Sequence, residues 1–142
     1  PPLLDELGLG PALESFVRVQ ARRAGLALDL AIEPNAPRLP AQLEIAAFRV
    51  VQESLTNVIR HAQAARVAIA VQRTQEGIAL TVRDDGRGFD MQAMKVRTKA
   101  GEHAGLLGLR ERVNLFGGHF TIETAPGRGT EVRVTFPLEP AS

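Results

Sequence analysis

The chain has 142 residues, of which 44% are hydrophobic and 23% are charged. These values are typical of one globular domain, and they exclude a disordered tail or a fibrous repeat. The 17 basic and 16 acidic residues nearly balance, and Trp and Tyr are absent, so a nucleic-acid-binding protein is not indicated. The absence of cysteine excludes disulfides, a thiolate nucleophile and a cysteine zinc site.

The chain begins with Pro1 and Pro2, without a Met and without the basic and apolar segments of a signal peptide. We therefore interpret it as a piece of a longer protein. No apolar run approaches about 18 residues, the length that a membrane-spanning helix needs.

Apolar spacing predicts two helices in the first half of the chain, with a strand between them. The first helix begins at Gly10-Pro11 and ends before Gly25, since Pro favours the first helical position and Gly the position after the end. Alternating apolar residues predict a strand over 26–32. The second helix, 41–61, contains no Gly or Pro and is the longest predicted element.

The second half of the chain predicts two hairpins and one more helix. The predicted strands are 67–71, 78–82, 120–122 and 132–136, and the predicted helix is 106–116. Short turns join the strands of each hairpin, so the sheet must be mixed or antiparallel. We expect an α/β fold, a two-layer sandwich with helices on one face of a mixed sheet. The segment 89–104 has no clean period and is a candidate lid.

The long helix carries three polar residues beside its apolar stripe. Glu53, Asn57 and Arg60 lie at i, i+4 and i+7, within an arc of about 60°. A solvent-exposed flank with an ion pair is the alternative interpretation. Asn57 speaks against it, because Asn is a poor helix former and lies nearer the buried stripe, where a polar group needs partners.

A second polar group, the segment 84–89 (DDGRGF), follows the strand 78–82 directly. A plain turn is one interpretation of these carboxylates and glycines. The other is a ligand site, because glycines let a ligand approach the backbone and a carboxylate beside an apolar wall accepts a hydrogen bond from an amine such as that of adenine. The phosphate-binding GxxxxGK[ST] loop and the GxGxxG dinucleotide motif are both absent.

Four motifs in order span most of the chain and resemble the Bergerat-type ATP-binding fold. This fold is shared by sensor histidine kinases, type II topoisomerases, heat-shock chaperone ATPases and mismatch-repair ATPases. The segments 1–9, 57–62 and 105–112 resemble the nitrate-sensor-like group of bacterial two-component histidine kinases. The four motifs are Glu53-x-x-x-Asn57, Asp84-x-Gly86-x-Gly88-Phe89, Gly105-Leu106-Leu107-Gly108-Leu109 and Gly127-Arg128-Gly129-Thr130.

The resemblance implies that the chain binds ATP and Mg²⁺ and that Glu53, Asn57, Arg60 and His61 are its catalytic residues. The amide oxygen of Asn57 would bind Mg²⁺ directly, since Mg²⁺ often takes only one or two protein oxygens. Glu53 would hold a magnesium-bound water or help to accept a proton. Arg60 and His61 would bind the phosphates.

The other residues implied to bind ATP surround its base and its phosphates. Asp84 would accept a hydrogen bond from the adenine amino group, and Thr130 would support that contact through water. The backbone amides after Gly105 would bind the phosphates at the start of a helix. The remaining residues of the implied ATP site are Gly86, Gly88, Phe89 and Leu106.

Basic residues in the candidate lid, Lys95, Arg97 and Lys99, would cover the phosphates, although a solvated basic loop is the alternative. The sequence also departs from the family pattern. The family usually has a Gly two residues before the position of Gly105, where this chain has His103, and Asp85 replaces the Asn that is common after the adenine-binding Asp.

We therefore expect a single domain over 1–142, with 1–10 as the remnant of a linker and 89–104 as the ATP lid. The resemblance implies a catalytic domain that presents the γ-phosphate of ATP to a histidine on an upstream dimerisation domain, for relay to a response-regulator aspartate. None of the three histidines here has the acidic context of that phosphoacceptor. The implied parent is a homodimeric, membrane-anchored bacterial sensor with this domain in the cytoplasm, and the piece alone is expected to be monomeric.

Two alternatives remain open at this point. One is another enzyme of the same fold, either a serine-directed anti-sigma-type kinase or an ATPase that closes a dimer clamp. The other is a degenerate module that keeps the fold and acts only by docking.

Overall fold

The computed structural model describes residues 2–33, 38–88 and 104–138. Their elements follow the order α, α, β, α, π, β, β, α, β, β along the chain. The helices are α1 (Pro2–Leu7), α2 (Leu9–Ala24), α3 (Ala41–Asn57), the π-helix η1 (Val58–Ala62) and α5 (Ala104–Leu115). The strands are β1 (Ala27–Ile32), β2 (Arg66–Arg73), β3 (Gly77–Asp84), β4 (His119–Thr124) and β5 (Thr130–Pro137).

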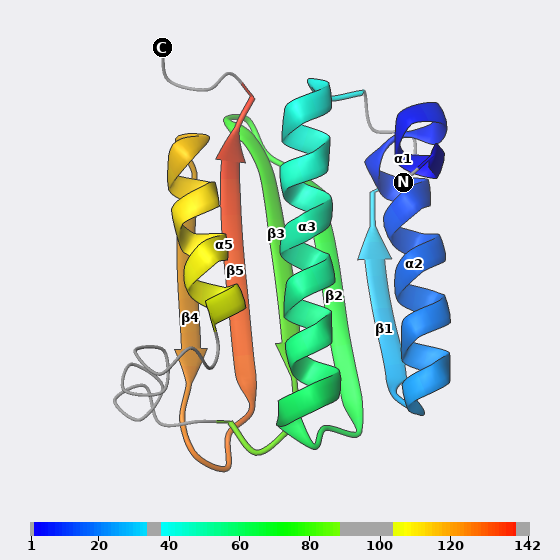
Figure 1. Cartoon of the computed structure of the whole chain (residues 1–142), viewed down its shortest axis with the longest axis vertical. Helices are drawn as coiled ribbons and strands as arrows, with labels where there is room; N and C mark the ends of the chain where they lie inside the picture. The colour runs from blue at the N-terminus through cyan, green and yellow to red at the C-terminus, as the bar shows by residue number, and fades with distance from the viewer. Residues whose placement is uncertain (1, 34–37, 89–103, 139–142) are drawn as a thin grey trace.

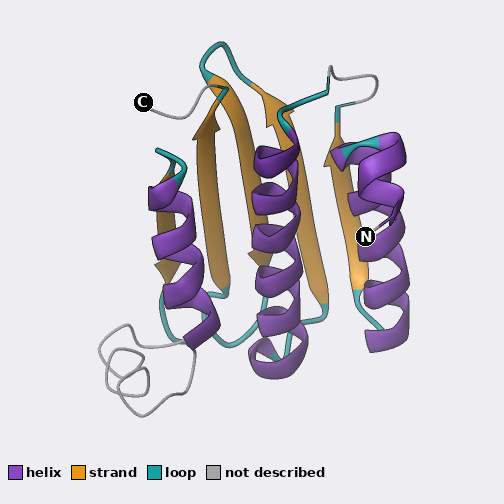
Figure 2. Cartoon of the chain, turned by 45° about the horizontal axis from the view of Figure 1, so that its top comes forward, coloured by secondary structure: helices purple, strands orange, loops and turns teal. Residues whose placement is uncertain are grey.

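The five strands form one sheet in the order β1-β2-β3-β5-β4. β1 pairs with β2 in parallel, and the other three pairings are antiparallel. Helices α2, α3 and α5 lie side by side over one face of this sheet (Figure 1). A turned view shows the same two layers, with all helices on one side (Figure 2). The predicted mixed sheet with helices on one face is therefore confirmed.

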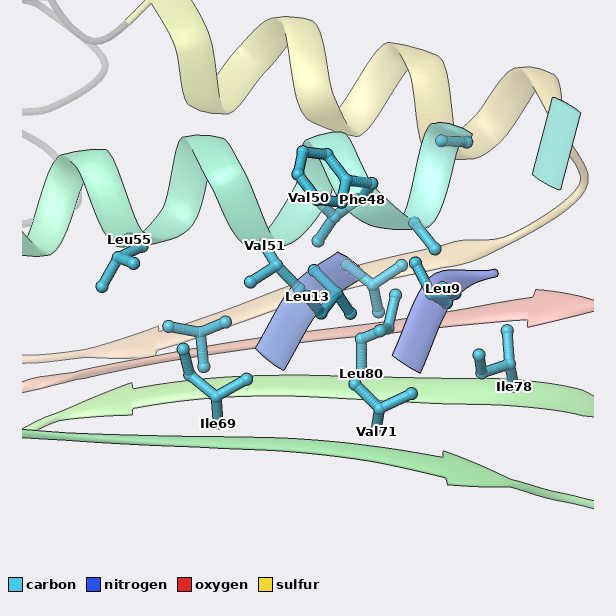
Figure 3. Close-up of a cluster of buried hydrophobic side chains, with 14 of the residues drawn as sticks. Leu9, Leu13, Phe48, Val50, Val51, Leu55, Ile69, Val71, Ile78 and Leu80 are labelled. Carbon is cyan, nitrogen blue, oxygen red and sulfur yellow. The ribbon is translucent and has the colours of Figure 1, made fainter. Parts of the chain in front are cut away.

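The core fills the space between α3 and the central strands. Alternate residues of a strand point to the same face, and Ile69 and Val71 of β2 and Ile78 and Leu80 of β3 are buried on the helix side. The apolar side chains of α3 pack against these strand residues (Figure 3). Burying one such aliphatic side chain stabilises the fold by about 1.5–3 kcal/mol. This packing fixes α3 above β2 and β3, and so sets where its C-terminal end lies.

The start of the chain differs from the sequence prediction. α2 begins at Leu9, and the short helix α1, which the apolar spacing did not predict, precedes it. Leu4 of α1 is only 2% exposed. The guanidinium group of Arg38 donates hydrogen bonds to the backbone oxygens of Leu4 and Asp5 and to the buried carboxylate of Glu44 at the start of α3. The first residues of the chain are thus fastened to the helix layer by partners distant in sequence.

The end of the long helix is the second difference. The α-helix predicted over 41–61 stops at Asn57 and continues as one π-helical turn, η1, before Gln63 ends it in the left-handed conformation, with φ of 52°. A π-helix has i→i+5 hydrogen bonds and is most often a single turn at a functional site. The angular position expected for Arg60 on a regular α-helix therefore does not apply.

Within the residues that the structure describes, none of the helices combines the length and the apolar character that crossing a bilayer requires.

Candidate functional site

Four segments that are distant in sequence meet at one edge of the sheet. They are the C-terminal end of α3 with η1, the C-terminal end of β3, the N-terminal end of α5 and the turn between β4 and β5 (Figure 1). The predicted site residues on α3, on the segment after β3, on α5 and on β5 therefore lie at the same edge. Gly105 and Leu106 lie in the first turn of α5. Phe89 and the rest of the predicted lid up to residue 103 lie outside the described residues.

Asp84, the last residue of β3, is the buried acid of this edge. It is 6% exposed, and its Oδ1 atom accepts a hydrogen bond from the backbone amide of Gly86 at 2.8 Å. Burial raises the pKa of the Asp84 carboxyl, and the hydrogen bond from Gly86 opposes part of this increase. A buried carboxylate with remaining acceptor capacity favours a ligand that donates a hydrogen bond.

Asp84 is part of a row of polar side chains on the helix face of the sheet. It lies opposite Thr130 on β5, and Thr130 lies opposite Thr124 on β4. The hydroxyl oxygens of the two threonines are 2.9 Å apart, and the Thr124 hydroxyl also donates to the backbone oxygen of Gly129. Thr130 therefore lies beside the acid. Thr124 was not predicted, because only the strand register reveals its place in the row.

The neighbouring carboxylate, Asp85, has a structural role. Its Oδ1 atom accepts hydrogen bonds from the backbone amides of Arg66 and Ala65, both at 2.9 Å. These two bonds hold the pKa of the Asp85 carboxyl below its ordinary value. Asp85 thus fixes the start of β2, and the exchange of the family's Asn for Asp leaves an acceptor in place for this contact.

The two glycines of the segment after β3 permit close approach between parts of this chain. A Cβ atom on Gly86 would lie 2.2 Å from the backbone oxygen of Ala62, at the end of η1. A Cβ atom on Gly88, which has a φ of 63°, would lie 2.0 Å from the backbone oxygen of Ala125. The sequence interpretation, in which the glycines let a ligand reach the backbone, therefore omitted the contacts with η1 and with the β4–β5 turn.

The polar residues of α3 and η1 lie at the same edge, with different exposure. Glu53 and Asn57 are half-buried, whereas Arg60 and His61 are exposed on η1. Among the described residues, the buried amide nitrogen of Asn57 has no hydrogen-bond partner. The described part of the fold therefore leaves this buried nitrogen without a partner, and a buried polar atom of this kind favours an interaction with a ligand or a water molecule.

The side-chain oxygen atoms at this edge suit a hard cation that a bound ligand would also coordinate. Within the described part of the chain, no group of three or more His, Cys, Asp or Glu side chains converges as a metal cage. Glu53 and Asn57 offer one carboxylate and one amide oxygen on successive turns of α3. Mg²⁺ commonly takes one or two such oxygens together with substrate phosphates, so these residues fit the predicted ion.

Comparisons with known proteins agree with this geometry. The family model for "Histidine kinase-, DNA gyrase B-, and HSP90-like ATPase" matches residues 42–140. The histidine-protein kinase/phosphatase DegS of Brevibacillus brevis is 35% identical over 135 residues, which are 95% of this chain and 34% of that protein. The sensor histidine kinase ComP of Bacillus subtilis is 34% identical over 142 residues, and the match covers 97% of this chain and 18% of ComP. The chain thus spans about a third or less of the length of these curated relatives.

A solved structure shows the same fold. The histidine kinase domain from the blue-light activated histidine kinase of Erythrobacter litoralis EL346 superposes with a TM-score of 0.76 at 21% identity, covering 92% of this chain and 61% of that one. The family match, the relatives and the shared fold lead to one assignment. The chain belongs to the family of histidine kinase-, DNA gyrase B- and HSP90-like ATPases.

Proposed function

We propose that this chain is the catalytic domain of a sensor histidine kinase, which binds ATP with Mg²⁺ and presents the γ-phosphate to a histidine on a dimerisation domain of the parent protein. The observation that carries the proposal is Asp84, a buried acid at the sheet edge where α3, α5 and the β4–β5 turn meet. Asp84 would accept the adenine amino group, with Thr130 beside it. Gly86 and Gly88 shape the backbone around this base site.

The phosphates would extend from the base site toward η1 and the start of α5. Arg60 and His61 are exposed there and supply cationic and donor groups. The first amides of α5, at Gly105 and Leu106, would add donors at the positive end of a helix dipole. Phe89 belongs to this proposal as a further wall of the ATP site.

Asn57 would bind Mg²⁺ through its amide oxygen, and Glu53 would hold a magnesium-bound water or help to accept a proton. When bound, the ion neutralises charge on the phosphates. The chain's own residues then contribute mainly positioning and electrostatic stabilisation, since phosphoryl transfer requires little covalent chemistry from the protein. In the transfer itself, the bond between the γ-phosphorus and the ADP oxygen breaks, a phosphorus–nitrogen bond to the acceptor histidine forms, and that histidine loses its proton.

The domain organisation and partners follow from the same proposal. Residues 1–142 would form one catalytic domain, with 1–10 leading from the dimerisation domain and 89–104 closing over ATP. The phosphorylated histidine would pass its phosphoryl group to a response-regulator aspartate. The parent would be a homodimeric, membrane-anchored bacterial sensor of the nitrate-sensor-like group with this domain in the cytoplasm. The names of the relatives DegS and ComP support the kinase part of this proposal.

Calorimetric titration tests the proposed ATP site. ADP and a non-hydrolysable ATP analogue are titrated with and without Mg²⁺ into the unchanged chain, Asn57→Ala and the control Gln52→Ala. Gln52 is half-buried on the same helix but lines the α2–α3 surface instead. We expect magnesium-dependent binding by the unchanged chain and by Gln52→Ala, and loss of the magnesium dependence in Asn57→Ala. Binding that ignores Mg²⁺, or no binding by the unchanged chain, would contradict the proposal.

A second measurement tests the missing acceptor. After incubation of the chain alone with γ-labelled ATP, no stable phosphate should appear on the protein, because the acceptor histidine belongs to another domain. Stable labelling of this chain would contradict that part of the proposal.

A further inference from the structure

The segment after β3 is bonded to the end of η1 through Arg87. The backbone amide of Arg87 donates to the backbone oxygen of Ala62 at 2.7 Å. The Nε atom of the same residue donates to the backbone oxygen of His61, also at 2.7 Å. Two successive carbonyl groups of η1 are therefore held by one residue, and the missing Cβ of Gly86 is what allows the two backbones to come this close.

Arg87 is itself held from the opposite side. Its backbone oxygen accepts a hydrogen bond from the amide of Gly127, at 2.6 Å, in the turn between β4 and β5. The adjacent Asp84 and Thr130 are paired between β3 and β5. Arg87 thus connects the part of the site that would bind the base with the turn that bears Arg60 and His61.

The physical requirement for such a connection lies in η1. The last carbonyl groups of a helix have no partner within the helix, and cationic side chains are favourable at this end. Local interactions contribute little to the stability of a π-helical turn that is followed by a non-glycine residue with positive φ. The guanidinium group and the backbone amide of Arg87 stabilise η1 through hydrogen bonds from a distant part of the chain.

We propose that Arg87 is a positioning residue of the ATP site: it locks η1 to the segment after β3, and so sets the place of Arg60 and His61 relative to the base site at Asp84. This inference rests on the proposed function, because it assigns Arg60 and His61 to the phosphates. Arg87 acts through the backbone of η1 and makes no contact with ATP. Its loss would weaken binding of the phosphates and leave binding of the base unchanged.

The test compares a nucleoside with its diphosphate. Affinities for adenosine and for ADP with Mg²⁺ are measured by NMR titration on the unchanged chain, Arg87→Ala, Arg87→Lys and the control Arg66→Ala. Arg66 is an exposed arginine near the same sheet edge, and its side chain pairs with Asp29 instead of η1. The hydrogen-exchange rates of the amides over 58–62, measured without nucleotide, show directly whether Arg87 stabilises η1.

We expect Arg87→Ala to weaken ADP binding by about 3- to 10-fold, the effect of one lost hydrogen bond, and to leave adenosine binding unchanged. Exchange over 58–62 should accelerate in the same variant. Arg87→Lys, which keeps a cationic donor, should recover part of the ADP affinity, and Arg66→Ala should match the unchanged chain in both affinities.

Equal weakening of adenosine and ADP by Arg87→Ala would overturn the inference, since it would show a general structural role. Unchanged ADP affinity, or unchanged exchange over 58–62, would overturn it as well. If the unchanged chain binds neither adenosine nor ADP, the proposed function fails and this inference fails with it.

Discussion

Asp84 and Asp85 are adjacent in the chain, but their carboxylates have opposite environments. Asp84 is buried, and its carboxyl interacts with the backbone amides of Gly86 and Thr130. Asp85 is exposed and accepts backbone hydrogen bonds from Ala65 and Arg66. Burial raises the pKa of Asp84, whereas the two amides lower the pKa of Asp85. Asp85 thus stabilises the fold, whereas Asp84 remains a buried carboxylate that can still accept a hydrogen bond from a ligand.

Asp84→Asn should weaken nucleotide binding and stabilise the fold. An amide oxygen at this position still accepts the Gly86 hydrogen bond, but the charge-assisted bond to an amino group is lost. A charge-assisted hydrogen bond contributes about 1.5–3 kcal/mol, so ADP affinity should fall by about 10- to 100-fold. Calorimetric titration measures this fall. Thermal unfolding at neutral pH should give a higher midpoint for Asp84→Asn, because the buried charge is gone.

A lower midpoint would indicate that the Asp84 carboxylate stabilises the fold without a ligand. The control is Asp85→Asn, which keeps an acceptor for Ala65 and Arg66 and should leave nucleotide affinity unchanged. Loss of affinity in this control would show that the effect does not belong to Asp84 alone.

The raised pKa of Asp84 predicts how binding and stability respond to pH. Between the ordinary pKa of an aspartate and the raised value, the folded state holds a proton that the unfolded state has released. Stability therefore falls as pH rises through this interval. Adenosine affinity should change in the opposite sense, falling as acidification protonates the acceptor, and this fall should begin at a higher pH than for an ordinary aspartate.

Adenosine is the suitable probe for this pH dependence because it has no phosphates that titrate. Its affinity for the unchanged chain and for Asp84→Asn would be measured from about pH 8 down to about pH 4, near the ordinary pKa of an aspartate. Only the unchanged chain should lose affinity on acidification. An equal loss in Asp84→Asn would assign the pH dependence to another group.

The sequence allowed prediction of those features that depend on local patterns. Alternating apolar residues such as Ile69 and Val71 identified the strands, because the side chains of a strand alternate between two faces. Gly25 marked the end of α2, where the structure shows the left-handed conformation that glycine favours. The site residues on α3, β3 and β5 came from the family resemblance instead, and they lie at one edge because α3 and β3 end there and β5 begins there.

The features that escaped prediction depend on contacts between distant residues. The π-turn η1 is held by Arg87, which lies 26 positions after its partner His61. Asp85 bonds to Ala65 across 20 positions. The helix α1 is fastened by Arg38, whose partners in α1 lie 33 and 34 positions away. Local propensity contains no information about such contacts, and they decide the geometry of this edge and of the first helix.

Gly86→Ala and Gly108→Ala should shift stability in opposite directions. The added Cβ at residue 86 would lie 2.2 Å from the Ala62 oxygen, so either η1 or the segment after β3 must move. We expect a loss of about 2 kcal/mol or more in the free energy of unfolding. Gly108 lies inside α5, where none of the described residues comes within 4 Å of an added Cβ. Alanine favours a helix over glycine by about 1 kcal/mol.

Denaturant unfolding of both glycine variants measures these changes. ADP affinity should fall in Gly86→Ala, because either η1 or the segment after β3 is displaced and both border the proposed ATP site. If Gly86→Ala were as stable as the unchanged chain, the close approach to Ala62 would not be required by the fold.

Ser54→Ala should stabilise the chain. Ser54 lies on the buried face of α3, is 2% exposed, and has a hydroxyl oxygen without a hydrogen-bond partner among the described residues. A buried unpaired hydroxyl costs about 1–3 kcal/mol, and alanine is also the better helix former. We expect denaturant unfolding to show a gain of about 1 kcal/mol. Thr56→Ala is the control, since the Thr56 hydroxyl donates to the Gln52 backbone oxygen at 2.8 Å.

Removing the satisfied hydroxyl of Thr56 should give a smaller gain or a loss of stability. Ser54 precedes Asn57 by three positions, which places the two residues on the same side of α3. A loss of stability in Ser54→Ala would contradict the prediction. It would show that the hydroxyl is satisfied in solution, for example by a bound water molecule.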